Sequence, residues 1–464
     1  MPDAIAVQTE APVAAPGERR IIAGQAGTVL VGQLAVMAFG VTDTIVAGRF
    51  SEDALASLSV GAAIFITVFV SLMGVLQALL PIWAELHGAR RGAEVGASVR
   101  QSLYLCAAAV VVGMAILLMP GPLLQWTGVP DAMRGSVERY LNILAFSLPP
   151  VLLFRLFGTL NQSLGKPRLV TWLQLGALAV KLPLSVWLAF GGAGVPALGL
   201  EGCALASLAV NWAMLASAIW VLRHQPVYAG LRLWQRLEAP DWRAIRAFAR
   251  LGIPAGLAVL VEVTSFTLMA LFIARLGTAS AAAHQVASNL TAVAYMFPLS
   301  LAIATSARVS FWLGAGDPVA ARNACRKGFE MTVLCALAWA GAMVAFRWQL
   351  ASLYSDRPAV VALAATLLLA TAGYHVADAL QTLCVFLLRC YRVTVMPLVL
   401  YCALLWGVGL GGSYVLAYRG FGRVPAMQSP LAFWLMSGAA LAATAVLFVW
   451  LLWRAMHRTK VRAA

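Results

Sequence analysis

The chain has 464 residues, of which 62% are hydrophobic and 11% are charged, and its mean hydropathy is +0.85. Because soluble domains carry roughly a quarter charged residues, this composition excludes a soluble enzyme or binding domain. It indicates a chain that crosses a membrane many times.

Apolar segments long enough to form a spanning helix recur along the whole chain. They are separated by charged or Gly- and Pro-rich connections, and the alternating pattern of an outer-membrane barrel is absent. We therefore expect an all-α polytopic membrane protein. The predicted spans are 21–47, 54–80, 101–119, 140–161, 169–190, 203–222, 251–274, 283–306, 330–350, 361–388, 394–417 and 431–453.

The remaining segments are polar or basic and divide the chain. Residues 1–20 are rich in Ala and Pro, lack the apolar core of a signal peptide, and are predicted to be a disordered tail. Residues 223–250 form the longest basic connection, and residues 454–464 form a basic tail. We therefore expect an N-terminal lobe at 21–222 and a C-terminal lobe at 251–453.

The distribution of basic residues predicts the orientation in the membrane. With the N-terminus inside, 23 of the 33 Lys and Arg residues fall on inner loops and tails. Cytoplasmic loops carry such an excess, so both termini are predicted to be cytoplasmic. The chain has a net charge of +15, and its basic cytoplasmic surface is expected to face anionic lipid headgroups. Nucleic acid is therefore not an expected partner.

The two halves of the chain are related by a repeat with one constant offset, which aligns Gly88 with Gly314. GARRGAEVGASVRQ from Gly88 resembles GAGDPVAARNACRK from Gly314, and the same offset aligns Arg49 with Arg275. Each half holds six spans, so the repeat predicts two lobes related by a pseudo-two-fold axis along the membrane normal. Proteins with such repeats bind substrate between the repeats and work by alternating access.

Three acidic residues lie inside predicted spans: Asp43 in FGVTDTIVAG, Glu262 in VLVEVTSF and Asp378 in GYHVADALQ. A carboxylate away from water is costly unless it is paired, protonated or bound to a cation, so these acids are predicted to be cation or proton sites. The alternative is a structural acid that is hydrogen-bonded between helices. The repeat aligns Asp43 with Met269 and Asp378 with Leu152, so the two lobes are expected to differ in task.

Polar residues on the same helix faces are candidate partners of these acids. His375 and Gln381 lie three residues before and after Asp378, and Ser265 follows Glu262 by three residues. Oxygen-rich surroundings suit Na⁺, whereas an isolated buried carboxylate suits a proton. Both ions remain candidates at Glu262 and Asp378. His375 is more often a helix residue that donates a hydrogen bond than one that titrates.

No motif of an enzyme or of a cofactor site is present. The chain has no H-E-x-x-H, G-x-S-x-G or P-loop lysine motif, and its seven cysteines lack metal-ligand spacing. We expect no enzymatic activity, no cofactor and no metal site other than one for the coupling ion. A membrane enzyme would need a His–Asp pair at one membrane surface, whereas His375 and Asp378 lie in mid-span.

Several segments resemble the multidrug and toxic compound extrusion (MATE) transporters, in particular the NorM-like bacterial branch. They include VTDTIVAGRFSEDALASLSVG, NQSLGKPRLV, GLEGCALASLAVNW, LGIPAGLAVLVEVTSF, AAAHQVASNL and ADALQTLCVFLLRCYR, and the resemblance covers about residues 21 to 455. It implies a Na⁺- or H⁺-coupled antiporter of the inner membrane that expels organic cations or aromatic compounds. Asp43, Glu262 and Asp378 match the family's acids on spans one, seven and ten.

One departure from the resemblance concerns two basic residues in the first lobe. The family usually has Asn-Ile-Pro in span five, whereas this chain has VKLPLS with Lys181 in the Asn place, and Arg155 lies on span four. We expect Lys181 to pair with Asp43, because each would be costly alone. The other interpretation makes Lys181 and Arg155 contacts for an anionic group of the substrate.

Other transport functions remain open at this point. A relative that exports one endogenous metabolite, or that flips a lipid-linked sugar, would suit the two basic residues, but the three acids argue against it. A receptor or scaffold would not need three buried acids. We expect a monomer in contact with membrane lipid, and the natural substrate and the coupling ion stay open.

Overall fold

The computed structural model describes residues 17–126, 130–192, 194–420, 422 and 425–463, and these form helices and their connections. The first half contains α1 (Glu18–Phe50), α2 (Glu52–Gln77), α3 (Leu80–Gly88), α4 (Gly92–Leu118), α5 (Gly121–Trp126), α6 (Asp131–Ala145), α7 (Leu148–Ser163), α8 (Arg168–Phe190), α9 (Gly199–His224) and the short helix η1 (Pro226–Leu231). The second half contains α10 (Trp242–Ala274), α11 (Thr278–Gly314), α12 (Pro318–Ala345), α13 (Arg347–Ser352), α14 (Pro358–Cys390), α15 (Val395–Tyr401), the π-helix η2 (Cys402–Gly411), α16 (Gly412–Tyr414), the π-helix η3 (Val415–Arg419) and α17 (Pro430–Ala463).

Twelve spans are present if one bent pair is counted as a single crossing. Within the described residues eleven helices are long and apolar enough to cross a membrane, and α6 and α7 meet at 46° to form the twelfth. The all-α fold predicted from the sequence is therefore confirmed.

Several helices extend beyond the spans predicted from hydropathy. The α4 helix begins at Gly92 rather than at 101, and α12 begins at Pro318 rather than at 330. The added parts of the two helices carry charged side chains, such as Glu94 on α4 and Arg322 on α12, which an apolar window excludes although the backbone stays helical. For the same reason Glu18–Arg20, residues 242–250 and the chain to Ala463 are helical, whereas the predicted tail at 1–16 lies outside the described residues.

Local sequence signals explain where three of the long helices begin. Ser51 precedes α2 and accepts a hydrogen bond from the backbone N–H of Ala54. Asp241 precedes α10 and Asp317 precedes α12, and each carboxylate accepts from two backbone N–H groups of the first turn. Short polar side chains at this position satisfy donors that have no partner within the helix.

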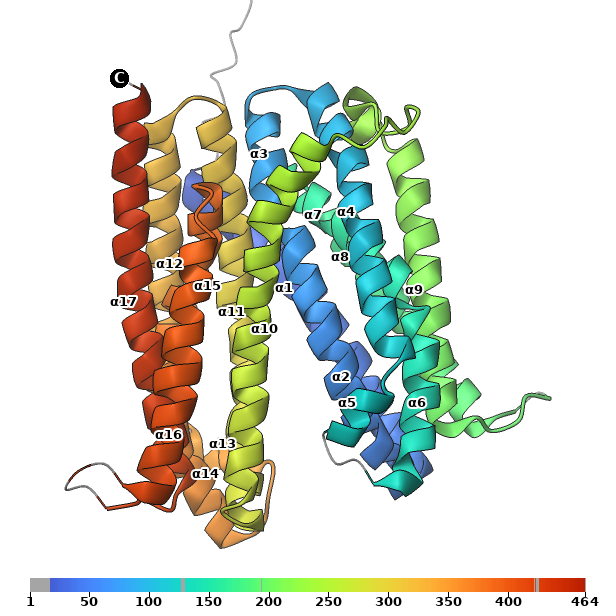
Figure 1. Cartoon of the computed structure of the whole chain (residues 1–464), viewed down its shortest axis with the longest axis vertical. Helices are drawn as coiled ribbons and strands as arrows, with labels where there is room; N and C mark the ends of the chain where they lie inside the picture. Colours follow the sequence, from blue (N-terminus) through green and yellow to red (C-terminus); the bar gives the residue numbers. More distant parts are fainter. Residues whose placement is uncertain (1–16, 127–129, 193, 421, 423–424, 464) are drawn as a thin grey trace, which may run out of the picture.

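The helices form two lobes, one from α1–α9 and one from α10–α17, which stand side by side (Figure 1). Elements of the first lobe return in the second with the offset that aligns Gly88 with Gly314. For example, α5 at Gly121–Trp126 corresponds to α13 at Arg347–Ser352, and α2 with α3 corresponds to the single helix α11. The repeat inferred from the sequence is therefore a repeat of structure.

Two equivalent glycines lie where α3 and α11 cross. A Cβ atom on Gly88 would overlap the carbonyl oxygen of Phe311, and one on Gly314 would overlap the carbonyl oxygen of Glu85. The repeat relates Gly88 to Gly314 and Glu85 to Phe311, so the contact is reciprocal, as a two-fold axis requires. Glycine permits this close approach of the two backbones.

The two lobes contact each other where α1 begins and α11 ends, and between α3 and the segment that follows α14. Glu18 at the start of α1 accepts hydrogen bonds from Arg308 Nε, at 3.1 Å, and from Trp312 Nε1, at 2.7 Å. Arg392, which follows α14, donates to Glu85 of α3 at 2.6 Å. The lobes converge at the end that carries the C-terminus and separate toward the other end (Figure 1).

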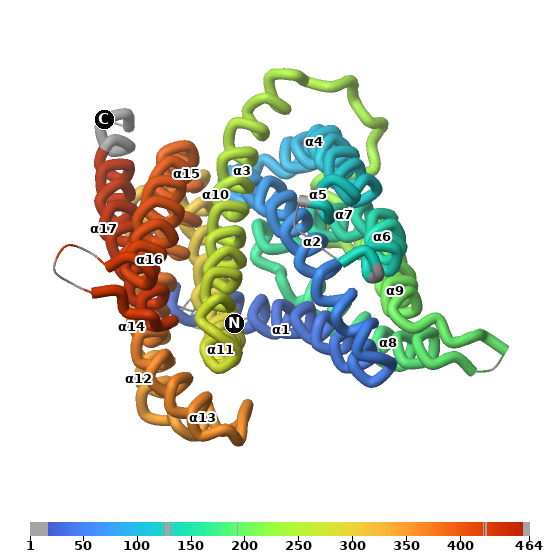
Figure 2. Tube along the Cα trace, turned by 60° about the horizontal axis from the view of Figure 1, so that its bottom comes forward, coloured from blue at the N-terminus to red at the C-terminus, as the bar shows by residue number. Residues whose placement is uncertain are grey.

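The connection between the lobes is fastened to the first lobe. This connection runs from α9 to α10 across the end of the molecule at which the lobes converge (Figure 2). The buried guanidinium of Arg100 on α4 donates to both carboxylate oxygens of Glu238 and to the carbonyl oxygen of Arg232. Gln101 bonds the backbone of Ala239 and Asp241, so the start of α10 is tied to α4.

Candidate functional site

The charged side chains predicted from the sequence fall into two groups, one in each lobe. The first group joins α1, α8 and α9. Lys181 Nζ lies 2.8 Å from Asp43 Oδ1 and 2.6 Å from Ser207 Oγ, and Ser207 Oγ lies 3.4 Å from Asp43 Oδ2. Lys181 is fully buried and Asp43 is 8% exposed.

The ion pair expected between Lys181 and Asp43 is therefore present. Its burial costs the hydration of both ions, which the 2.8 Å contact and the Ser207 hydroxyl offset. The ammonium group also lies 5.9 Å from the centre of the Phe39 ring. The pair has no net charge, so this part of the first lobe offers no free carboxylate to a cation.

The second group joins α10 and α14. Gln381 Nε2 donates to Asp378 Oδ1 at 2.9 Å and lies 3.4 Å from Glu262 Oε1, so one amide serves both carboxylates. Asp378 and Gln381 are buried and Glu262 is half-buried. Two carboxylates around one neutral amide repel each other, and a cation or a proton between them relieves this repulsion.

Two buried polar residues on α14 and α15 were not predicted from the sequence. The hydroxyl of Tyr401 on α15 donates to Gln381 Oε1 and so fixes the amide with its NH₂ toward the acids. The predicted span 361–388 leaves out Arg389, but α14 continues to Cys390 and Arg389 is buried. Its guanidinium lies 4.4 Å from the centre of the Phe386 ring.

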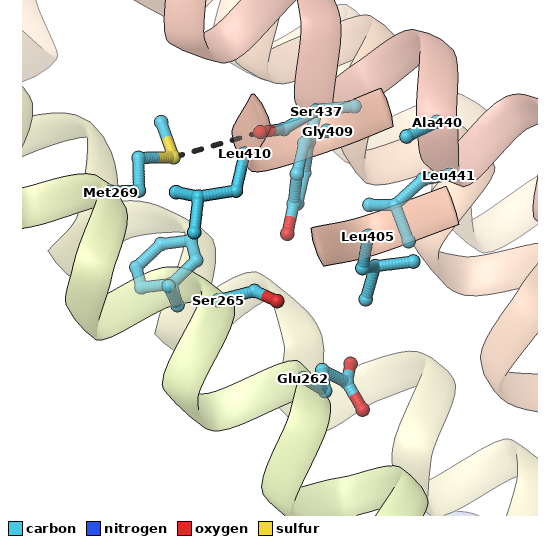
Figure 3. Close-up of a pocket in the computed structure, with 11 residues that line it drawn as sticks. Glu262, Ser265, Met269, Leu405, Gly409, Leu410, Ser437, Ala440 and Leu441 are labelled. Atoms are coloured by element: carbon cyan, nitrogen blue, oxygen red, sulfur yellow. Dashed lines mark hydrogen bonds between the residues drawn. The ribbon is translucent and has the colours of Figure 1, made fainter. Parts of the chain in front are cut away.

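A small cavity of about 30 Å³ lies beside Glu262. Glu262 and Ser265 lie on one face of α10, and their oxygen atoms are directed toward the cavity, which Leu405, Gly409 and Leu441 also line (Figure 3). A buried water molecule needs roughly 10–15 Å³ of such space, so the cavity has room for a water molecule or a monovalent ion.

The cavity wall opposite Glu262 has an unusual backbone. Leu405 and Gly409 belong to η2, a π-helix of ten residues, and three glycines (Gly407, Gly409 and Gly411) lie in it. π-Helical turns are rare and are frequently found at functional sites. The unusual backbone thus supports the assignment of this cavity as part of the site.

His375 and Arg155 lie apart from both groups. Neither ring nitrogen of the buried His375 has a hydrogen-bond partner within the described part of the chain, so it is not the partner of Asp378. Nε and Nη2 of Arg155 on α7 are buried and likewise lack a partner among the described residues. Of the two predicted partners of Asp378, Gln381 is therefore the one that donates a hydrogen bond to it.

Spanning helices in two repeated lobes, with charged groups inside each lobe, define a polytopic membrane transporter. A family model described as MatE matches residues 29–187 and 254–415. The chain belongs to the MatE family, whose members are transporters rather than enzymes, and the resemblance seen in the sequence is confirmed.

Curated relatives match over nearly the whole chain. The chain is 38% identical to a probable multidrug resistance protein NorM from Aromatoleum aromaticum, with 96% of this chain and 97% of the relative covered. It is 31% identical to the multidrug resistance protein MdtK of Yersinia pseudotuberculosis, with 93% of this chain and 94% of the relative covered. These relatives place the chain among NorM-like members of the family.

Solved structures share the fold at lower sequence identity. The eukaryotic MATE transporter AtDTX14 matches with a TM-score of 0.84 at 19% identity, over 96% of this chain and 99% of that chain. The Vibrio cholerae MATE transporter VcmN in its bent form matches with a TM-score of 0.81 at 17% identity, over 96% and 98% of the two chains. The two-lobed architecture is therefore that of MATE transporters.

Proposed function

We propose that this protein is a cation-coupled antiporter that exports drugs or other toxic organic compounds across the bacterial inner membrane by alternating access. The observation that carries the proposal is the sharing of the Gln381 amide by Glu262 and Asp378. Two acids with one neutral donor form a site that is incomplete without a cation or proton. Na⁺ and H⁺ are both suitable coupling ions.

The arrangement of the lobes supports alternating access. The contacts between α1, α3 and α11 lie at the end where α17 ends, and the lobes separate toward the opposite end (Figure 1). With both termini in the cytoplasm, as the excess of basic residues on that side suggests, this conformation opens outward. Occupation of the acid pair by an ion would then favour one of two conformations by its differential affinity.

The names of the relatives support a broad substrate range. Those relatives are multidrug resistance proteins, and we infer organic cations or aromatic compounds as substrates of this chain too. A flippase for a lipid-linked sugar is less well supported. Of the two basic residues that could bind an anionic substrate group, Lys181 is neutralised by the Asp43 carboxylate, which leaves Arg155. The protein is proposed to act as a monomer.

Drug susceptibility tests this proposal. The gene is expressed in a bacterium that lacks its own efflux pumps, and the minimum inhibitory concentrations of several unrelated cationic or aromatic compounds are measured. We expect a rise for more than one compound, and no rise for a Glu262→Gln variant present in the membrane at the same level. Equal susceptibility of cells with and without the wild-type protein would contradict multidrug export.

A further inference from the structure

The repeat relates Arg155 in the first lobe to Gln381 in the second. The offset between them is the one that aligns Gly88 with Gly314, and they lie on equivalent helices, α7 and the second half of α14. Gln381 points into its lobe and donates to Glu262 and Asp378. The first lobe therefore carries a guanidinium where the second lobe carries the amide that serves the acid pair.

The acids have no counterpart in the first lobe. The same offset replaces Glu262 by Val36 and Asp378 by Leu152, both apolar. Nε and Nη2 of Arg155 are buried and without a partner within the described residues, while the side chain as a whole is only half-buried. An arginine with unsatisfied donors in a membrane protein is costly unless an acceptor arrives from outside the chain.

A second polar group without a partner lies on the same helix. Gln162 is seven residues, or about two turns, after Arg155, so both side chains share one face of α7. Gln162 Oε1 is also buried without a hydrogen-bond partner in the part of the chain that the structure describes. The face of α7 around Arg155 therefore offers polar groups to a ligand that this chain does not itself supply.

We propose that Arg155 binds the anionic group of a ligand, namely a carboxylate, sulfonate or phosphate carried by the transported compound, or a free inorganic anion such as chloride. This inference rests on the proposed export function and narrows its substrate class. The guanidinium fork matches a carboxylate in two parallel hydrogen bonds. Compounds with both a cationic or aromatic body and an anionic group would then be preferred over purely cationic ones.

Binding of two matched dyes to the purified protein in detergent tests the proposal. A rhodamine with a free carboxylate and its methyl ester differ in this one group. We compare wild type with Arg155→Gln, which installs the side chain of the equivalent position, and with Arg326→Gln, which removes an arginine that is 70% exposed. Dye affinity is measured by fluorescence anisotropy at several chloride concentrations.

If the substrate supplies the anion, Arg155→Gln weakens binding of the free-carboxylate dye about ten-fold or more and leaves the ester within about two-fold. If chloride supplies it, chloride competes with the carboxylate dye or raises the melting temperature in wild type, and both effects vanish in Arg155→Gln. Arg326→Gln should behave as wild type in either case. Equal effects of Arg155→Gln on both dyes, without chloride dependence, would overturn the proposal.

A second variant covers the case in which Arg155→Gln does not fold. Arg155→Lys keeps the charge and loses the fork, so a reduced but retained preference for the carboxylate dye supports the proposal, and loss of affinity for both dyes alike contradicts it. Binding in detergent needs no ion gradient. A protein that bound the dyes as expected but did not couple their export to an ion would contradict the antiport and leave this inference standing.

Discussion

Lys181 on α8 and Asp43 on α1 form a buried ion pair, with 2.8 Å between Nζ and Oδ1. The pair ties together two helices of the first lobe and takes Asp43 out of the set of free acids. The second lobe keeps two acids around Gln381. Ion binding is therefore expected to depend on Glu262 and Asp378. The first lobe is expected to act by breaking and forming the Lys181–Asp43 ion pair.

A double-mutant cycle tests the pair. Lys181→Asn and Asp43→Asn should each destabilise the protein by about 3 to 5 kcal/mol, because each leaves the other charge buried and alone. The double variant should lose less than either single variant. Melting temperature in detergent and dye efflux from cells are measured for all four proteins, and additive losses would show that the two charges do not interact.

The crossing of α3 and α11 is predicted to be intolerant of any side chain. Gly88→Ala and Gly314→Ala place a methyl group where a backbone carbonyl lies, so each should lower the melting temperature markedly. Gly341→Ala on α12 is the control, because nothing lies within 4 Å of a Cβ at that position. Alanine there should be neutral or stabilise the helix by up to about 1 kcal/mol. Unchanged stability of Gly314→Ala would mean that the two backbones lie farther apart.

The connection between the lobes should loosen when Glu238 loses its charge. Hydrogen bonds from Arg100 hold the pKa of Glu238 below its usual value of 4.5. A carboxylate with a lowered folded-state pKa stabilises the fold above its unfolded-state pKa, and this contribution is lost as the pH falls through the folded-state value. The connection is therefore expected to stay fastened across about pH 6 to 8.

Trypsin cleavage of the purified protein measures this fastening. Glu238→Gln should accelerate cleavage after Arg232 and Arg236 at neutral pH, because the neutral side chain holds Arg100 less strongly. Glu94→Gln is the matched control, since it removes the partner of Arg91 in an exposed ion pair. Equal cleavage rates of wild type and Glu238→Gln would assign the fastening to Gln101 and the backbone instead.

Much of the fold and part of the site could be predicted from the sequence. Apolar runs of spanning length predicted the helices, and the offset between Gly88 and Gly314 predicted the two lobes, because these features are local or periodic. The pairing of Lys181 with Asp43 could be predicted because the family resemblance implies that spans one and five are neighbours, and each charge would be costly alone. Such reasoning works where one interaction is much more favourable than its alternatives.

Other features depend on packing that no local pattern indicates. The predicted span ends at 388, before Arg389, because hydropathy does not tell a charge at the end of a helix from one in the loop that follows. Tertiary packing buries this arginine inside α14. The hydrogen bond from Tyr401 to Gln381 joins two different helices, and the π-helix η2 has no sequence signature beyond its glycines. His375 shares a helix face with Asp378, but no hydrogen bond joins them within the described residues.

The acid pair gives the most direct prediction for transport. Glu262→Gln and Asp378→Asn keep the size of each side chain and remove its charge, so each should leave the protein folded in the membrane while abolishing efflux coupled to an ion gradient. Glu94→Gln, which neutralises an exposed carboxylate, should transport as wild type does.

Dye efflux from proteoliposomes, with a Na⁺ gradient or a proton gradient imposed separately, tests the coupling role of Glu262 and Asp378. We predict that wild type moves the dye against its gradient with at least one of the two ions, and that neither Glu262→Gln nor Asp378→Asn does so with either. Wild-type rates in either variant under the gradient that drives the wild type would contradict the role assigned to the acid pair.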